Sequence, residues 1–252
     1  MNGEADITVG VTEFPTVRRA FEKSEISIIG AAAKVEQQNL IGRRDRGIEQ
    51  VSDLKGKRIG TTFGTIAEFY LGRFLELNGI NIQDITVIDL KTPAEWENAV
   101  ADGVVDAVVT AQPYADLASK RLGSNAIVWS AQNGQYLFGL IVSSKEWVTK
   151  HPDVASRFLK ALALADEYAV RNPAEAKTIM QKWLDVDTAF VESVWSRDQF
   201  SLTFEQGLIV AMEDEARWMI ANGLTTEKTV PDFMDYIYLD GLKAVKPEAV
   251  TL

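Results

Sequence analysis

The sequence contains no cysteine and only one histidine, His151, among its 252 residues. The lack of thiols excludes disulfide bonds, cysteine nucleophiles and cysteine-ligated metal sites. A serine–histidine–aspartate triad would have to use His151, which precedes Pro152 at an expected helix start and is better explained as a solvated turn residue. The chain is therefore poorly equipped for catalysis, and we expect neither a cofactor nor a metal.

The sequence also lacks long apolar runs and an excess of basic residues. No run approaches the roughly 20 apolar residues of a membrane span, and the first residues, MNGEADITVG, do not resemble a signal peptide. We therefore expect a cytoplasmic chain, a chain whose leader was removed, or a chain that lacks an N-terminal piece. The formal net charge of −10 disfavours non-specific binding of nucleic acid or anionic membranes, although a local anion site is compatible with it.

Short apolar runs alternate with amphipathic helical patterns through residues 1–130. The runs ITVIDL and VVDAVVT are rich in β-branched residues, as expected for strands that are covered on both faces. This alternation predicts βαβ units and parallel sheets. After a strand-like stretch at residues 135–143, helical patterns dominate, over residues 153–170, 173–184, 188–197 and 204–223. The sequence thus predicts an α/β half followed by a half rich in helices.

The stretch LKGKRIGTTFGTIAEFYL, residues 54–71, has the order of a phosphate-binding loop: strand, glycine-rich turn and helix. Ligands bind at the carboxyl ends of strands in open α/β sheets, and the amides of a helix start favour an anion. Thr65 and Glu68 have the spacing of a capping box, which places the helix start at Gly64–Thr65. We expect Thr62, Gly64 and Thr65 to donate hydrogen bonds to a ligand oxyanion, with a plain strand–helix turn as the alternative.

Nucleotide-binding motifs do not fit this loop. The P-loop lysine is missing, because the helix start reads Gly-Thr-Ile, and Lys55 and Lys57 precede the strand at its opposite end. The glycines of the segment are evenly spaced, unlike those of the dinucleotide motif. The loop therefore predicts a site for an anion or a polar ligand without phosphoryl chemistry.

Several segments, taken in order, resemble one family of transport proteins. They are NGEADITVGVTEFP, GIEQVSDLKGKRIGTTFGT, LELNGINIQDITVIDL, AVADGVVDAVVTAQPYA and WVTKHPDVASRFLKALALADEYAVRNPAEA. In this order and spacing they resemble periplasmic solute-binding proteins of ABC importers. The resemblance is to the aliphatic sulfonate, taurine and nitrate group of the NMT1/THI5-like family, which is related to proteins of thiamine-pyrimidine synthesis, and it covers nearly the whole chain.

The resemblance implies a two-lobed, type II periplasmic-binding-protein-like α/β fold, in which each lobe is a mainly parallel sheet flanked by helices. Residues 1–44 and 137–252 would form lobe 1, and residues 45–136 would form lobe 2. The lobes would close around a small-molecule ligand in the cleft and present it to an ABC permease in the membrane. The resemblance also implies a periplasmic or lipid-anchored extracytoplasmic location.

One departure from the family concerns the N-terminus. Family members carry a leader, a strand, a helix and a second strand before the segment that NGEADITVG resembles. We therefore expect lobe 1 to be incomplete at the N-terminus. A lobe without these strands would expose apolar surface and unpaired strand edges, so we expect reduced stability or self-association through that lobe.

Further candidate ligand residues follow other expected strands. The loop TEFPT offers Thr12, Glu13 and Phe14, where Glu13 would accept a hydrogen bond from a ligand ammonium group or would simply be an exposed loop acid or a first-turn helix charge. In the pattern AQPYA, Gln112 and Tyr114 are candidates at the start of another helix. The family often shows an aromatic residue and an acid before this proline, whereas this chain has Ala111 and Gln112, which predicts a roomier and less charged corner. The remaining candidates are Phe63 in the glycine-threonine loop and, as walls for an apolar ligand body or as plain packing, Tyr136 and Phe138.

Together these features predict a binding protein and not an enzyme. The ligand would be a small organic anion or zwitterion, sulfonate-like or taurine-like, captured for ABC import. A second interpretation keeps the fold and binds a planar aromatic or pyrimidine ligand with Phe14, Phe63 and Tyr114. A detached sensory module is a further alternative. The enzyme alternative, thiamine-pyrimidine synthesis, relies in related proteins on a histidine and a cysteine-rich metal segment, and this chain has no cysteine.

Overall fold

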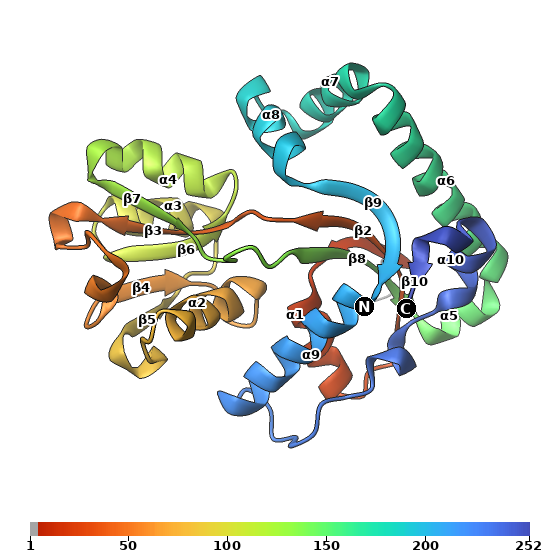
Figure 1. Cartoon of the computed structure of the whole chain (residues 1–252), viewed down its shortest axis with the longest axis horizontal. Helices are drawn as coiled ribbons and strands as arrows, with labels where there is room; N and C mark the ends of the chain where they lie inside the picture. Colours follow the sequence, from red (N-terminus) through yellow and green to blue (C-terminus); the bar gives the residue numbers. More distant parts are fainter. Residues whose placement is uncertain (1–4) are drawn as a thin grey trace. The chain divides into compact units, whose positions relative to one another are not determined.

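The computed structural model describes residues 5–252, so the first residues of the expected lobe 1 lie outside the described part. The chain forms two compact units (Figure 1). The first contains the N-terminal part up to Val35 together with Leu137–Leu252, and the second is Glu36–Tyr136.

The second unit is built on a five-stranded sheet with the order β5-β4-β6-β3-β7. Strand β4 is parallel to both β5 and β6, whereas β3 is antiparallel to β6 and β7. The strands are β3 (Gln38–Arg43), β4 (Arg58–Thr61), β5 (Thr86–Asp89), β6 (Ala107–Ala111) and β7 (Ala126–Ser130). The connecting helices are α2 (Ile66–Leu77), α3 (Pro93–Ala101) and α4 (Tyr114–Leu122).

The periodic spacing of apolar residues in the sequence explains the order of strands and helices in this unit. Each helix follows a strand and buries one apolar face, so β4-α2-β5 and β5-α3-β6 are the predicted βαβ units. Single-turn 3-10 helices fill the connections: η1 (Arg44–Arg46), η2 (Val51–Leu54), η3 (Ile82–Asp84) and η4 (Gly123–Asn125). A cluster under α3 and α4 forms part of the core, and it contains Ile41, Leu90, Ala99, Val100, Val105, Val108, Ala115, Ala118 and Leu122.

The first unit has a five-stranded sheet with the order β1-β8-β2-β9-β10. Its strands are β1 (Ile7–Val11), β2 (Ile26–Val35), β8 (Leu137–Ser144), β9 (Gln199–Glu205) and β10 (Val250–Thr251). The expected mainly parallel sheet does not describe this unit, because only β9 and β10 pair in parallel. Strand β8 inserts between β1 and β2 and runs opposite to both, and β9 also runs opposite to β2.

Helices make up most of the rest of the first unit. They are α1 (Glu13–Phe21), α5 (Lys145–Lys150), α6 (Pro152–Arg171), α7 (Pro173–Leu184), α8 (Thr188–Arg197), α9 (Gln206–Ala221) and α10 (Leu239–Val245), with the 3-10 turns η5 (Phe233–Tyr236) and η6 (Pro247–Ala249). No helix in the described part of the chain is both long enough and apolar enough to cross a membrane.

Two expectations from the sequence need correction here. The helical pattern at residues 204–223 begins too early, because Phe204 and Glu205 end β9 and the helix starts at Gln206. The expected first boundary, after residue 44, also differs from the structure. Strand β3 pairs with β6 and β7, so residues 36–44 belong with the second unit.

Candidate functional site

The glycine-threonine loop, residues 62–65, joins the carboxyl end of β4 to the start of α2. Thr65 is the N-cap, as predicted, and its Oγ1 accepts a hydrogen bond from the Ala67 amide at 3.3 Å. The same hydroxyl donates to the carbonyl oxygen of Thr62 at 2.8 Å. These two bonds fix the loop against the first turn of the helix.

The predicted capping box is replaced by an arrangement shifted by one residue. The Glu68 carboxylate accepts from the Gly64 amide at 2.7 Å, and the Glu68 amide donates to the Thr65 carbonyl at 3.1 Å. Gly64 has a φ of +74°, the left-handed region that favours glycine, and its amide faces the Glu68 carboxylate. A capping prediction from spacing alone cannot anticipate this turn of the backbone.

The other predicted donors of the loop also have partners within the second unit. Thr62 Oγ1 donates to the Leu90 carbonyl at 2.7 Å, and the Phe63 amide donates to Asp89 Oδ1 at 3.1 Å. Hydrogen bonds from Lys91 and from the Phe63 amide hold the pKa of Asp89 below its ordinary value. The loop is therefore preorganised, but a bound oxyanion would have to exchange with these acceptors, two of which are carboxylates.

Gln112 and Tyr114 lie at the carboxyl end of β6, where α4 begins. Because β4 and β6 are parallel neighbours, this corner and the glycine-threonine loop share one edge of the sheet. The Gln112 side chain donates to Asp116 at 2.9 Å, and the Gln112–Pro113 peptide bond is cis.

A residue that the sequence analysis did not single out, Trp96, joins the two corners. Its Nε1 donates to the Leu90 carbonyl at 3.2 Å, the acceptor that Thr62 also uses. Its ring contacts Tyr114 edge-on, with ring centroids 5.2 Å apart. The structure therefore brings Thr62 and Tyr114 into one network, through contacts that no local pattern in the sequence signals.

The side chain of Phe63 is 46% exposed at the tip of the loop. An aromatic ring at this level of exposure, next to a set of polar donors, offers an apolar surface beside a polar one. The sequence named Phe63 as a candidate, and the structure leaves it accessible.

The candidates in the first unit are placed differently. Thr12 is the N-cap of α1 and is half-buried, with its carbonyl accepting from Thr16 Oγ1 at 3.1 Å. Glu13 is fully buried and accepts from the Phe138 amide at 2.5 Å, so it is not the exposed acid that one interpretation expected. Phe14 is buried against Trp218, with ring centroids 6.0 Å apart.

The remaining candidates lie near the point where the chain returns to the first unit. Tyr136 is half-buried, whereas Phe138 is buried in the core of the first unit and packs there as the alternative interpretation held.

His151 is exposed between α5 and α6 and contacts the Trp147 ring, as expected for a turn residue. No cluster of three or more histidine, aspartate or glutamate side chains in residues 5–252 has an arrangement suited to a metal ion.

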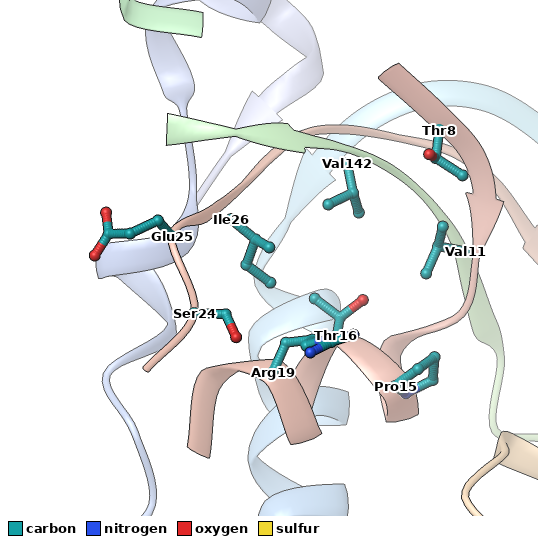
Figure 2. A pocket seen from close by; sticks show the side chains of 9 residues that line it. All are labelled: Thr8, Val11, Pro15, Thr16, Arg19, Ser24, Glu25, Ile26 and Val142. Atoms are coloured by element: carbon teal, nitrogen blue, oxygen red, sulfur yellow. The ribbon is translucent and has the colours of Figure 1, made fainter. Parts of the chain in front are cut away.

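A pocket of about 320 Å³ lies between the sheet and α1 in the first unit (Figure 2). It is lined by Thr8 and Val11 of β1, Pro15, Thr16 and Arg19 of α1, Ser24, Glu25 and Ile26 before and at the start of β2, and Val142 of β8. The pocket adjoins the loop TEFPT through Pro15 and Thr16, but the candidates Thr12, Glu13 and Phe14 do not line it.

Comparisons with known proteins agree with this architecture. A family model described as NMT1/THI5 like matches residues 1–176. A binding protein from Brucella abortus (strain 2308) is 27% identical over 184 residues, covering 69% of this chain and 56% of the relative. An aliphatic sulfonates-binding protein from Bacillus subtilis (strain 168) is 28% identical over 160 residues, covering 64% of this chain and 48% of the relative. The chain spans about half the length of these curated relatives.

Solved structures show the likeness of fold. The alkanesulfonate-binding protein SsuA from Xanthomonas axonopodis pv. citri, bound to MOPS, has a TM-score of 0.78 at 22% identity, over 94% of this chain and 81% of that chain. The aliphatic sulphonate-binding protein SsuA from Escherichia coli has a TM-score of 0.74 at 18% identity, over 94% of this chain and 80% of that chain. The desulfurization enzyme DSZB has a TM-score of 0.70 at 15% identity, over 96% and 85%. The predicted α/β fold class is confirmed, apart from the mainly parallel sheet expected for the first unit.

Proposed function

Because the chain belongs to the NMT1/THI5-like family, we propose that it is the solute-binding component of an ABC import system. It captures a small organic anion or zwitterion and delivers it to a membrane permease, outside the cytoplasm, either in the periplasm or on a lipid anchor. The names of several relatives support this proposal, since they specify sulfonate-binding proteins.

The observation that carries the proposal is the polar network at one edge of the second unit's sheet. It combines the Thr62 and Thr65 hydroxyls and the start of α2 with the Trp96–Tyr114 aromatic pair. The amides and dipole of a helix start favour an anionic group. The exposed ring of Phe63 adds the apolar surface that the hydrocarbon part of a sulfonate requires.

The carboxylates in the same loop narrow the ligand class. The carboxylates of Glu68 and Asp89 already accept from the Gly64 and Phe63 amides, so a plain anion has to compete with both for these donors, although Lys91 is paired with Asp89. A zwitterion has an ammonium group that these carboxylates attract and a sulfonate that the hydroxyls and helix start attract. We therefore favour a taurine-like aminosulfonate over an alkanesulfonate.

The proposal rests on the residues of the second unit. In addition to the loop, Gln112, Tyr114 and the partly exposed Tyr136 of the same unit are proposed ligand contacts. Thr12, which is partly exposed in the first unit, remains a separate candidate. Glu13 and Phe14 do not, because their side chains are buried. The burial of Phe14 also removes one ring from the alternative pyrimidine site.

Binding is proposed and not catalysis, although the desulfurization enzyme shares the fold. The sequence contains no cysteine nucleophile, and its single histidine lies in an exposed turn.

Self-association through the first unit also remains a proposal. Strand β1 is an edge strand with an exposed Val9, and light scattering would test whether copies of the chain pair there.

A thermal-shift screen with taurine, ethanesulfonate, nitrate and hydroxymethylpyrimidine tests the function. A ligand at about 100 times its dissociation constant stabilises the folded state by about 2.7 kcal/mol. We expect taurine to raise the melting temperature most. A shift produced by the pyrimidine and by none of the sulfonates would overturn the proposal.

A further inference from the structure

Two buried acidic side chains face the packing between α1 and α9. Glu13 is 0% exposed and Glu215 is 1% exposed. The two helices pack against each other within the first unit, as Figure 1 shows, and the contact between the Phe14 and Trp218 rings joins them next to the acids. Buried acids in such a position are uncommon unless they are paired or neutral.

In the described part of the chain, each of the two carboxyl groups has one buried oxygen without a hydrogen-bond partner, and a proton bound between them would supply the missing bond. Glu13 Oε1 accepts from the Phe138 amide at 2.5 Å. Glu13 Oε2 and Glu215 Oε2 are both buried, and within residues 5–252 neither oxygen has a hydrogen-bond donor. A protonated carboxyl carries an O–H donor, so one shared proton between the two acids supplies the missing bond.

The charged side chains near Glu13 and Glu215 would not compensate for ionisation of both acids. The acid that acts on Glu215 in addition to Glu13 is Asp214. The arginines of α1 and α9, namely Arg18, Arg19 and Arg217, have exposed side chains that pair with Glu22 or Glu213 at the surface.

Among residues 5–252, the strands and the 3-10 turn packed against the two helices offer no cation that is free of an acidic partner. Strand β8, LFGLIVSS, has no ionisable side chain. On β9, Glu205 is bonded to Lys34, and η5 contributes Asp235 and Tyr236.

We propose that Glu13 and Glu215 form a carboxyl pair that shares a proton. Proton binding by this pair is thereby coupled to the packing of α1 on α9 and to the contact of Glu13 with the start of β8. Burial raises the pKa of Glu13 to about 8. Burial, followed by the charge of Glu13, raises the pKa of Glu215 well above its ordinary range. The pair therefore holds a proton near neutral pH. Loss of this proton places two negative charges next to each other in the core.

The position of the pair makes it a conformational device. Phe138, whose amide Glu13 holds, is the second residue of β8, directly after the chain enters the first unit at Leu137. Charging the pair at alkaline pH weakens the junction of α1, α9 and β8. This role is separate from the ligand loop of the second unit, so its failure would leave the proposed function standing.

The test is the unfolding equilibrium of the full chain between about pH 5 and pH 9. A carboxyl with a raised pKa stabilises the folded state fully below its ordinary pKa, and this contribution is lost as the pH rises through the folded-state value. The unfolding constant of the wild type should therefore rise with pH, by up to about tenfold per pH unit for each proton released. Glu215→Gln should reduce this dependence, because only one buried acid remains, and the double variant Glu13→Gln/Glu215→Gln should flatten it.

Glu213→Gln is the matched control, because Glu213 lies on the same helix with its side chain at the surface. It should keep the wild-type dependence. A wild-type unfolding constant that does not change with pH, or a dependence that is the same in Glu215→Gln as in the wild type, would overturn the proposal.

A second measurement covers the case in which Glu215→Gln does not fold. Infrared spectroscopy of the wild type at neutral pH should show the carbonyl band of a protonated carboxyl, which disappears as the pH is raised. The band should change frequency in Glu13→Gln, because Glu215 then remains protonated beside an amide, and it should disappear in the double variant Glu13→Gln/Glu215→Gln. Its absence from the wild type, an unchanged frequency in Glu13→Gln, or its persistence in the double variant would contradict a shared proton.

Discussion

Thr62 and Trp96 donate to the same acceptor, the carbonyl oxygen of Leu90, at 2.7 Å and 3.2 Å respectively. Leu90 follows β5, Thr62 follows β4, and the ring of Trp96 contacts Tyr114 at the end of β6. A single carbonyl therefore links the loops after three neighbouring strands. This link turns separate candidate residues into one proposed ligand-binding face.

Replacing Trp96 by phenylalanine tests the link. The variant keeps an aromatic ring beside Tyr114 but removes the indole donor to Leu90, so we expect a loss of about 1 kcal/mol in the free energy of unfolding and weaker taurine binding. Urea unfolding and calorimetric titration measure the two effects. Trp183→Phe is the control, since Trp183 is 82% exposed and should change neither quantity.

Thr65→Ala should destabilise the chain by about 1 kcal/mol, because the N-cap acceptor of α2 is lost. Thr65→Ser keeps the oxygen and should restore most of that stability. If Thr65 also contacts the ligand, alanine lowers the affinity for taurine and serine restores it. Equal affinities in the two variants would remove Thr65 from the ligand contacts without affecting its role as a cap.

The second unit could be predicted closely from the sequence, because its signals are local. The strand–helix alternation gave the βαβ units, and Thr65 marked the start of α2. The insertion of β8 could not be predicted, since it pairs residues more than a hundred positions apart in the sequence. The burial of Glu13 was missed for the same reason, because it depends on packing against the distant α9.

The site was only partly predictable. Threonine and glycine after a strand indicated the loop, and their positions are correct. The partners of the loop were not evident, because Asp89, Leu90 and Trp96 reach it across a parallel pair of strands. Strand β9 was read in part as helix, because its last residues run directly into the amphipathic pattern of α9.

Asp106 should make the second unit sensitive to acid. Burial alone would raise its pKa, but hydrogen bonds from the side chain and amide of Arg58 outweigh this effect and lower it. A depressed pKa gives stability that is present above the ordinary value and is lost as the pH falls through the folded-state value.

Asp106→Asn should therefore cost about 2 kcal/mol at neutral pH and much less in acid. Urea unfolding at about pH 7 and pH 3 compares the two conditions. Asp102→Asn, which removes a more exposed acid nearby, is the control and should have a small effect at both. A deficit of the same size at both pH values would show that the ion pair with Arg58 is not its cause.

Glu68→Gln tests whether the loop selects a zwitterion. The amide side chain retains an oxygen acceptor for Gly64 but carries no charge, so ethanesulfonate should bind more tightly and taurine less tightly. A change of about 1 kcal/mol corresponds to roughly a fivefold change in affinity for each ligand. Glu76→Gln, on an exposed position of the same helix, should alter neither affinity.

The most direct measurement of the central claim is a calorimetric titration of the wild-type chain with taurine and with ethanesulfonate, which differ only in the amino group. We expect both to bind and taurine to bind at least several-fold more tightly. Absence of binding for both ligands would contradict the assignment of a sulfonate-type solute to this chain. Tighter binding of ethanesulfonate would contradict the role given to Glu68 and Asp89.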